Sequence, residues 1–222
     1  KMNLEFKKHL PLIGIVLMSF VYLATIWNTL PERVPVHWNY KGEIDGWGSK
    51  FTLIGMLFIL PVLTYVIMST ITKIDPKKRM SLMGGKLYQL KFVLVLFMSI
   101  LALFIIYSTK SQSTSSPSFI FALIGVLFVV LGNYFKVIQP NYFIGIRTPW
   151  TLQHEGVWKK THAFAGKLWF IGGLIIILGS VIFESATFST FFLTIVFVIA
   201  FSPIIYSFFK FKSLDKKKAI SN

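Results

Sequence analysis

Six long stretches without a charged side chain decide what this chain can fold into. A helix that crosses a membrane needs about 20 predominantly apolar residues, and each stretch is close to that length or longer. The stretches are Leu10–Leu30, Phe51–Thr72, Phe92–Thr109, Phe119–Phe135, Leu168–Phe183 and Ser185–Phe209. The fifth is short, and we expect its helix to extend back towards Gly166. The sequence therefore predicts an all-α membrane protein with six transmembrane helices.

The first stretch is too long for the apolar region of a cleavable signal peptide. Leu30-Pro31-Glu32 follows it, and no small-x-small cleavage site does. We therefore expect it to remain as a span.

The composition also indicates a membrane protein and excludes cysteine-dependent chemistry. The net charge is +15, yet 14% of the 222 residues are charged and 55% are hydrophobic. A soluble nucleic-acid binder would carry such a charge on a polar surface, which is too small here, so we expect no direct nucleic-acid partner. The chain has no cysteine, which excludes disulfides, cysteine-ligated metals and thiol catalysis. We expect no cofactor.

The basic residues lie in alternate loops. The N-terminal segment, the second loop, the fourth loop and the C-terminal tail carry 19 of the 23 Lys and Arg residues. Short loops rich in Lys and Arg stay in the cytoplasm. The pattern therefore predicts that both termini are cytoplasmic and that the first, third and fifth loops lie outside.

The external loop 31–50 has the pattern of a small ordered cap. Apolar residues alternate with other residues over Val34–Tyr40, which predicts a short strand. Gly42, Gly46 and Gly48 favour tight turns. We expect Trp38, Tyr40 and Trp47 to lie at the level of the lipid headgroups.

Three interpretations of the polar residues in this loop stay open. His37, Asn39 and Asp45 form either a local hydrogen-bond network that holds the loop or a recognition surface for an extracellular ligand. The third possibility is a metal site made by His37, Glu43 and Asp45, although the spacing does not require one.

The cytoplasmic loop 133–167 contains a helix-start signal. Thr148 followed by Pro149 is typical of a cap and first helical position, so we expect a helix from there to Ala165. Trp150, His154, Trp158 and His162 would share one stripe, which is typical of a helix in the membrane interface. Eight residues of helix span about 12 Å, so His154 and His162 cannot share one zinc ion. Arg147 is placed to pair with Glu155, a lipid phosphate or a partner protein.

The spans carry small residues but no ionisable group near their middle. In the fifth span, Gly172 and Gly179 are seven residues apart, as are Gly173 and Ser180, which predicts a face for close helix packing. The lack of central Asp, Glu, Lys, Arg or His weighs against a transport function. Asn28 and Asn133 nevertheless leave a transporter as an alternative.

The chain carries two longer motifs. The first is Leu30-Pro31, Pro35, His37-Trp38-Asn39, Gly42, Asp45-Gly46-Trp47 and Ser49-Lys50. The second is Gly132-Asn133, Asn141, Gly145-Ile146-Arg147-Thr148-Pro149-Trp150, Trp158, Thr161-His162 and Gly166. The two motifs resemble the short N-terminal domain and the C-terminal signature of the SdpI family, the membrane immunity proteins against the sporulation-delaying toxic peptide of bacilli. The resemblance implies an N-terminal half, residues 1–110, and a C-terminal half, residues 111–222.

The resemblance implies a protein of the bacterial plasma membrane that is not an enzyme. Its expected partners are a peptide toxin outside, a cytoplasmic transcriptional repressor captured at the membrane, and anionic lipids. The implied outward site is His37, Trp38, Asn39, Asp45 and Trp47. The implied inward site is Asn133, Asn141, Arg147, Thr148, Trp150, Trp158 and His162. The alternatives are a membrane-embedded metal-dependent enzyme and a toxin-exporting transporter.

Overall fold

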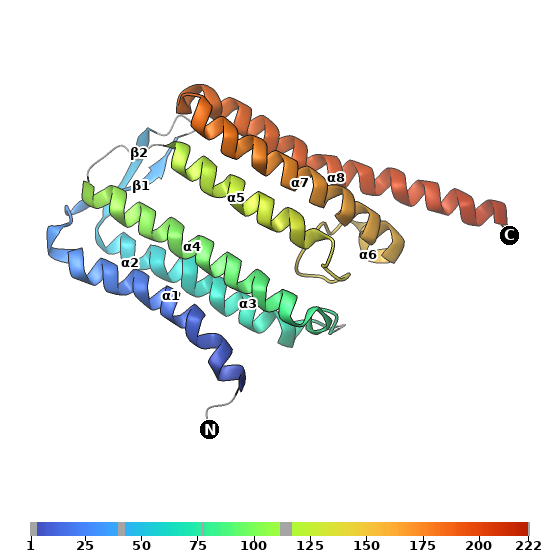
Figure 1. The fold of residues 1–222 in the computed structure, drawn as a ribbon, viewed down its shortest axis with the longest axis horizontal. Helices are drawn as coiled ribbons and strands as arrows, with labels where there is room; N and C mark the ends of the chain where they lie inside the picture. The colour runs from blue at the N-terminus through green and yellow to red at the C-terminus, as the bar shows by residue number, and fades with distance from the viewer. Residues whose placement is uncertain (1–3, 40–42, 77, 112–116, 222) are drawn as a thin grey trace. The chain divides into compact units, whose positions relative to one another are not determined.

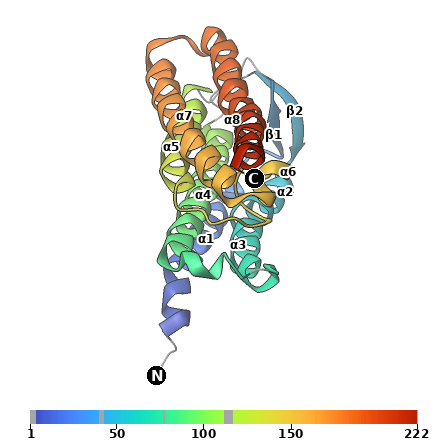
Figure 2. The ribbon, with the colours of Figure 1, turned by 90° about the vertical axis from the view of Figure 1, so that its right-hand side faces the viewer.

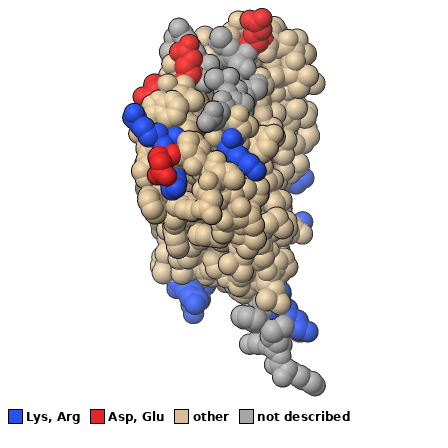
Figure 3. Space-filling model, turned by 90° about the vertical axis from the view of Figure 1, so that its left-hand side faces the viewer, with Lys and Arg blue, Asp and Glu red and all other residues tan. Residues whose placement is uncertain are grey.

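The computed structural model describes residues 4–39, 43–76, 78–111 and 117–221. The chain divides into two compact units. The first comprises residues 1–70 and 88–120, and the second comprises residues 71–87 and 121–222. Within these described residues, six helices are long and apolar enough to cross a membrane, as the sequence predicts. Figure 3 shows that side chains neither acidic nor basic cover most of the face in view.

The first unit is built on three membrane-length helical segments and one hairpin (Figure 1). Its elements are α1 (Leu4–Ile26), the 3₁₀ turn η1 (Trp27–Thr29), β1 (Arg33–Trp38), β2 (Ile44–Ser49), α2 (Phe51–Leu57), the π-helical turn η2 (Phe58–Val62), α3 (Leu63–Ile74) and α4 (Gly85–Ser111). α2, η2 and α3 follow one another without a break as a single span, Phe51–Ile74. The π turn contains Pro61, which has no N–H to donate to the helix and so disturbs the regular bonding pattern.

The core of the first unit holds the hairpin onto the helices. Leu30 and Val34 are buried in one cluster with Leu53, Leu57 and Ile106, which come from α2 and α4. Val34 is completely buried, so the first strand of the hairpin is anchored to the ends of the spans.

The second unit is a helical bundle. Its elements are η3 (Ser81–Met83), α5 (Pro117–Phe135), α6 (Pro149–Gln153), α7 (Glu155–Ile182) and α8 (Ser185–Ser221). Figures 1 and 2 show α7 and α8 side by side, and α5 packs on α7. Phe121, Ile176 and Phe188 bring these three helices into one buried cluster.

Glycines allow α5 and α7 to approach at backbone distance. A Cβ added to Gly173 would lie 2.6 Å from the carbonyl oxygen of Gly125, and one added to Gly166 would lie 2.7 Å from that of Gly132. Each pair takes one glycine from each of the two antiparallel helices, and within each helix the two glycines are seven residues apart. In lipid the hydrophobic effect does not drive helices together, so close packing at small residues takes its place.

The predicted small-residue face of the fifth span is divided between two neighbours. Gly172 and Gly179 face α8, where an added Cβ would meet Ile199 and the ring of Phe188 respectively. Gly173 instead faces α5. The separation arises because residues 172 and 173 lie about 100° apart around the helix axis.

The structure differs from the single helix expected over residues 148–165. α6 ends at Gln153, and His154 has φ −131° and ψ 110°, which is extended backbone. Residues 155–165 form the first turns of α7, so the fifth span begins at Glu155. The physical reason is a second cap, because His154 Nδ1 accepts a hydrogen bond from Gly156 N (3.1 Å) and starts a new helix. Trp150 is thereby separated from the stripe that continues through Trp158 and His162.

We expect Gly173→Ala to destabilise the α5–α7 pair. The new methyl group would overlap Gly125 O and Val129 N, which are backbone atoms that cannot rotate away. Overpacking of this kind costs about 1–3 kcal/mol, which would lower the thermal unfolding midpoint of the protein in detergent.

Gly14→Ala in α1 is the matched control, since no atom lies within 4 Å of its Cβ position. Alanine favours helix over glycine, so this variant should be as stable as the wild type or slightly more stable. Equal unfolding midpoints for the two variants would contradict the proposed backbone contact.

Candidate functional site

The external motif forms an antiparallel hairpin. Arg33 pairs with Ser49, Pro35 with Trp47, and Trp38 with Ile44, with register shifts on either side of His37. The first strand was predicted, but the second strand was not. The expected turns at Gly46 and Gly48 are strand positions instead, and Gly42 lies outside the described residues with Tyr40. Gly46 sits opposite His37, and a Cβ there would lie 2.7 Å from His37 Cβ, so a small residue permits the close pairing.

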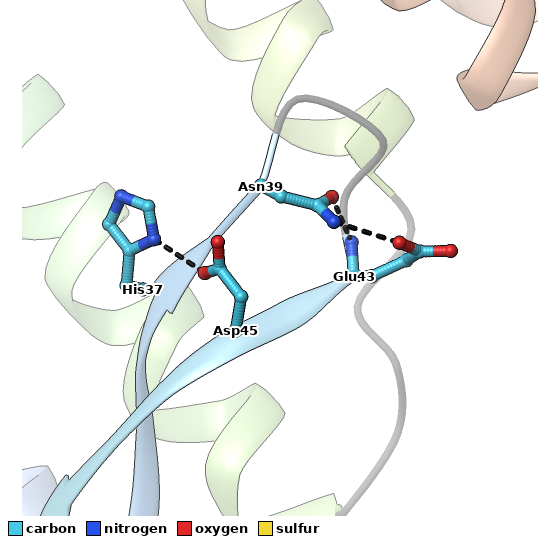
Figure 4. A network of polar contacts seen from close by, with 4 residues as sticks. All are labelled: His37, Asn39, Glu43 and Asp45. Atoms are coloured by element: carbon cyan, nitrogen blue, oxygen red, sulfur yellow. Dashed lines mark hydrogen bonds and ion pairs between the residues drawn. The ribbon is translucent and has the colours of Figure 1, made fainter.

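Two polar pairs connect the strands near the tip (Figure 4). His37 Nδ1 lies 2.5 Å from Asp45 Oδ1. Asn39 Nδ2 donates to Glu43 Oε2 (2.8 Å), and Asn39 Oδ1 accepts from Glu43 N (3.0 Å). The backbone N of Asn39 also donates to Glu43 O (2.9 Å). The hydrogen-bond network expected from the sequence is therefore present, and each pair joins β1 or its end to β2 or its start.

The metal interpretation would need His37, Glu43 and Asp45 to converge. Figure 4 shows His37 with Asp45, whereas Glu43 turns to Asn39. In the described parts of the chain, no group of three His, Asp or Glu side chains is placed to hold a metal ion.

An ion pair that the sequence reasoning missed closes the base of the hairpin. Lys50 Nζ donates to Glu32 Oε1 (2.6 Å), and Lys50 N donates to Glu32 O (3.0 Å). The ammonium also lies 5.2 Å from the centre of the Trp27 ring, a distance at which cations and aromatic faces attract. Lys50 follows β2 directly and Glu32 precedes β1 directly, so a hairpin prediction would have brought them together.

The two tryptophans of the hairpin differ in exposure. Trp38 is half-buried, whereas Trp47 is 53% exposed. The side chain of His37 is 70% exposed and that of Asp45 is 44% exposed. His37, Asp45 and Trp47 are thus available to a ligand while their backbone is held by strand pairing.

Asn141 organises the loop that precedes α6. Its Nδ2 donates to the carbonyl oxygens of Gln139 (2.8 Å) and Ile144 (3.0 Å), and its Oδ1 accepts from the N–H groups of Phe143 and Ile144 (2.7 Å each). Asn141 is 2% exposed. The side chain therefore replaces water for four backbone groups of a non-helical segment.

His162 and Trp158 hold the same loop from α7. The His162 ring stacks on Trp158, with centroids 4.0 Å apart, and its Nε2 accepts from Ile146 N (3.1 Å) while Nδ1 donates to Trp158 O (2.9 Å). This pattern requires a neutral ring with its proton on Nδ1. Trp158 Nε1 donates to Ile138 O (2.8 Å). Both side chains are almost completely buried.

Gly145 is required at this point of the loop. Its φ is +109°, a region that side chains disfavour, and an added Cβ would overlap His162 Nε2. The glycine in the motif therefore serves the contact between the loop and α7.

Thr148 caps α6 and ties it to α8. Its Oγ1 accepts from Thr151 N (3.2 Å), and its own N–H donates to Thr151 Oγ1 (2.9 Å). The Thr148 hydroxyl also lies 3.1 Å from that of Ser207. The helix start predicted at Thr148-Pro149 is confirmed, and the reciprocal threonine bonds complete a capping box.

Three residues of the inward set are less enclosed. Arg147 is exposed and donates from Nη1 to Tyr142 O (2.5 Å). Glu155, one of the three partners considered for Arg147, instead pairs with Lys159 (3.1 Å). Trp150 is half-buried with its ring edge against Phe208, and Asn133 is exposed on α5. The structure thus brings Asn141, Trp158 and His162 together around one loop and leaves Arg147 at its surface.

These features define a multi-pass α-helical membrane protein. Besides its six spans, it has an ordered hairpin, β1–β2, and an ordered loop before α6. Residues 137–207 match the model of the SdpI/YfhL protein family, and residues 14–64 match a domain of unknown function, DUF1648. The C-terminal part of the chain is therefore similar to the SdpI/YfhL protein family.

The chain is 27% identical over 172 residues to "Immunity protein SdpI" of Bacillus subtilis (strain 168). This similarity covers 77% of the chain and 80% of the relative. The two family matches contain the whole hairpin and every inward candidate except Asn133. No solved structure is significantly similar to the chain.

We expect Asn141→Ala to loosen the loop before α6. The change leaves four backbone groups without their partner, and an unsatisfied buried polar group costs about 1–3 kcal/mol. Hydrogen exchange in detergent should therefore become faster at the amides of Phe143 and Ile144.

Asn133→Ala is the matched control, since this exposed amide makes one long bond to Val129 O (3.4 Å). It should leave the exchange of those amides unchanged. Wild-type exchange in Asn141→Ala would show that the four bonds do not hold the loop.

Proposed function

We propose that this protein is a membrane immunity protein that protects the cell from an extracellular antimicrobial peptide, without catalysis. The observation that carries the proposal is the similarity to Immunity protein SdpI over 77% of the chain. The resemblance to immunity proteins against a sporulation-delaying peptide makes a peptide of that class the first toxin to test.

We place both termini and the inward motif in the cytoplasm. The support is the charge pattern, because loops rich in Lys and Arg stay inside. This orientation puts the hairpin outside, where a toxin would arrive. Under this proposal, outward recognition belongs to the half 1–110 and inward contacts belong to the half 111–222.

We expect single cysteines to report this orientation, since the chain has none of its own. Ser49→Cys at the hairpin should react with a membrane-impermeant maleimide on intact cells. Ser81→Cys in the second loop should react only after the membrane is permeabilised. Both positions are exposed, so a lack of labelling would not result from burial. The reverse labelling pattern would place the hairpin in the cytoplasm.

The proposed outward site is the face of the hairpin that carries His37, Asp45 and Trp47, with Trp38 and Asn39 as its support. Strand pairing, the buried Val34 and the Glu32–Lys50 ion pair hold this face in one conformation. A preformed face loses little entropy on binding. A peptide held there by its apolar and polar groups would be kept from inserting into the bilayer.

The proposed inward site is Arg147 with its neighbour Trp150, together with the other residues of the motif as their support. The contacts of Asn141, Thr148, Trp158 and His162 set the backbone on which Arg147 stands. An exposed guanidinium in a basic cytoplasmic face suits a protein with an acidic patch, and we propose that a cytoplasmic transcriptional repressor is captured there. Toxin binding would change this capture if the toxin preferred one arrangement of the helices.

We expect Trp47→Ala to reduce protection in a sensitive host challenged with the sporulation-delaying peptide. Trp47 is 53% exposed and takes no part in the His37–Asp45 or Asn39–Glu43 pairs, so its loss tests recognition rather than loop structure. Loss of a central aromatic anchor lowers affinity about tenfold or more, so the tolerated toxin concentration should fall about tenfold. His37→Ala and Asp45→Ala should also reduce it.

Lys110→Ala is the control, because this exposed residue lies at the expected external end of α4 and is not part of the hairpin. Membrane levels of all variants are compared by immunoblot. Full protection by Trp47→Ala would leave the polar pairs as loop structure and reject the outward site. Failure of the wild type to protect would reject this toxin class.

A further inference from the structure

A groove runs between α5 and α7 where their backbones meet. Gly132 and Gly166 form its floor, and the groove holds about 400 Å³ of open space. The floor is tight, because a Cβ on Gly132 would lie 2.8 Å from Gly166 O.

The walls of this groove are apolar. Ala163, Phe170 and Ile171 line it from α7. Ile171 is 55% exposed and Ala163 is exposed as well. In a membrane-spanning helix such exposed apolar side chains face hydrocarbon. An acyl chain is therefore the ligand that suits the apolar part of the groove.

Positive charge lies along the same groove. Lys136, Lys167 and Asn133 complete its lining, and Lys136 follows directly on Phe135, the last residue of α5. Neither lysine forms an ion pair with a carboxylate in the described parts of the chain. A second groove of about 310 Å³ is also lined by Asn133 and Lys136 and adds Lys86, so three lysines line the two grooves that share Asn133.

We propose that this groove is a binding site for one anionic phospholipid of the bilayer. An acyl chain lies on the Gly132–Gly166 floor, and the phosphate lies between Lys136 and Lys167 with the Asn133 amide as a further donor. Long lysine side chains reach a headgroup while their stems stay in the apolar region. Basic pockets between helices select anionic headgroups, and this site does not depend on the immunity function.

Lipid retention in native mass spectrometry tests the site. The full chain is purified in mild detergent and incubated with phosphatidylglycerol or with phosphatidylcholine of the same acyl chains. We expect the wild type to retain one phosphatidylglycerol about thirtyfold more strongly than phosphatidylcholine, since each of two nearby lysines contributes about 1 kcal/mol. Equal retention of the two lipids would overturn the proposal.

Two variants separate the site from general charge attraction. Lys136→Ala with Lys167→Ala should remove the preference, whereas Lys160→Ala with Lys212→Ala should keep it. The control pair removes the same charge from exposed positions of α7 and α8 that do not line this groove. An equal loss of preference in both double variants would overturn the site.

Ile171→Trp tests the apolar part with all the lysines in place. Ile171 lines the groove and is 55% exposed, so the larger ring would fill the space for the acyl chain, and lipid retention should fall several-fold while the unfolding midpoint stays near that of the wild type. Undiminished retention in a folded Ile171→Trp protein would overturn the placement of the acyl chain on the glycine floor.

Discussion

The close approach of backbone to backbone at glycine positions is the contact on which the second unit depends. Lipid tails are as apolar as the side chains of the spans, so burial of leucine or isoleucine does not hold two helices together. Gly125 and Gly132 instead meet Gly173 and Gly166 at distances that leave no room for a methyl group. α7 uses a second set of glycines, Gly172 and Gly179, against α8. One helix thereby serves as the centre of three.

Most polar residues of the inward motif are occupied with backbone groups rather than with solvent. A non-helical segment next to a membrane must find partners for its N–H and C=O groups. Asn141 satisfies four of them, His162 satisfies the N–H of Ile146, and Trp158 satisfies the carbonyl of Ile138. A long sequence signature can thus encode a scaffold, and Arg147 is the charged member of the motif that this scaffold presents.

The sequence was sufficient for features that depend on local patterns. Uncharged stretches predicted all six spans, alternation predicted β1, and Thr148-Pro149 predicted the start of α6. The sequence was insufficient where a single side-chain hydrogen bond decides the backbone conformation. His154 is such a case, because it caps α7 and thereby ends the helix expected over residues 148–165. β2 was missed because Gly46 and Gly48 disfavour strands in isolation, and only the opposite strand with His37 makes a small residue favourable there.

The partners of each glycine and of each motif residue were likewise beyond a single sequence. Gly172 and Gly173 are adjacent and chemically identical, yet one faces α8 and the other faces α5. Likewise, Arg147 and Glu155 have complementary charges and a suitable separation, but Lys159 lies one turn from Glu155 on the same helix and forms the pair. Such outcomes depend on packing between helices and on competition among neighbours, which periodicity does not contain.

The proposed lipid site and the inward motif share the same stretch of α7. His162 holds the loop at Ile146, and Gly166 with Lys167 lies one turn further along the helix, where α5 makes its backbone contact. An acyl chain in the groove would stiffen this crossing, and the loop that carries Arg147 is fixed to it through Trp158 and His162. A partner that recognises Arg147 would therefore meet a surface whose order depends on the surrounding lipid. The proposed lipid site and the proposed capture of a cytoplasmic partner would thus be linked through α7 alone.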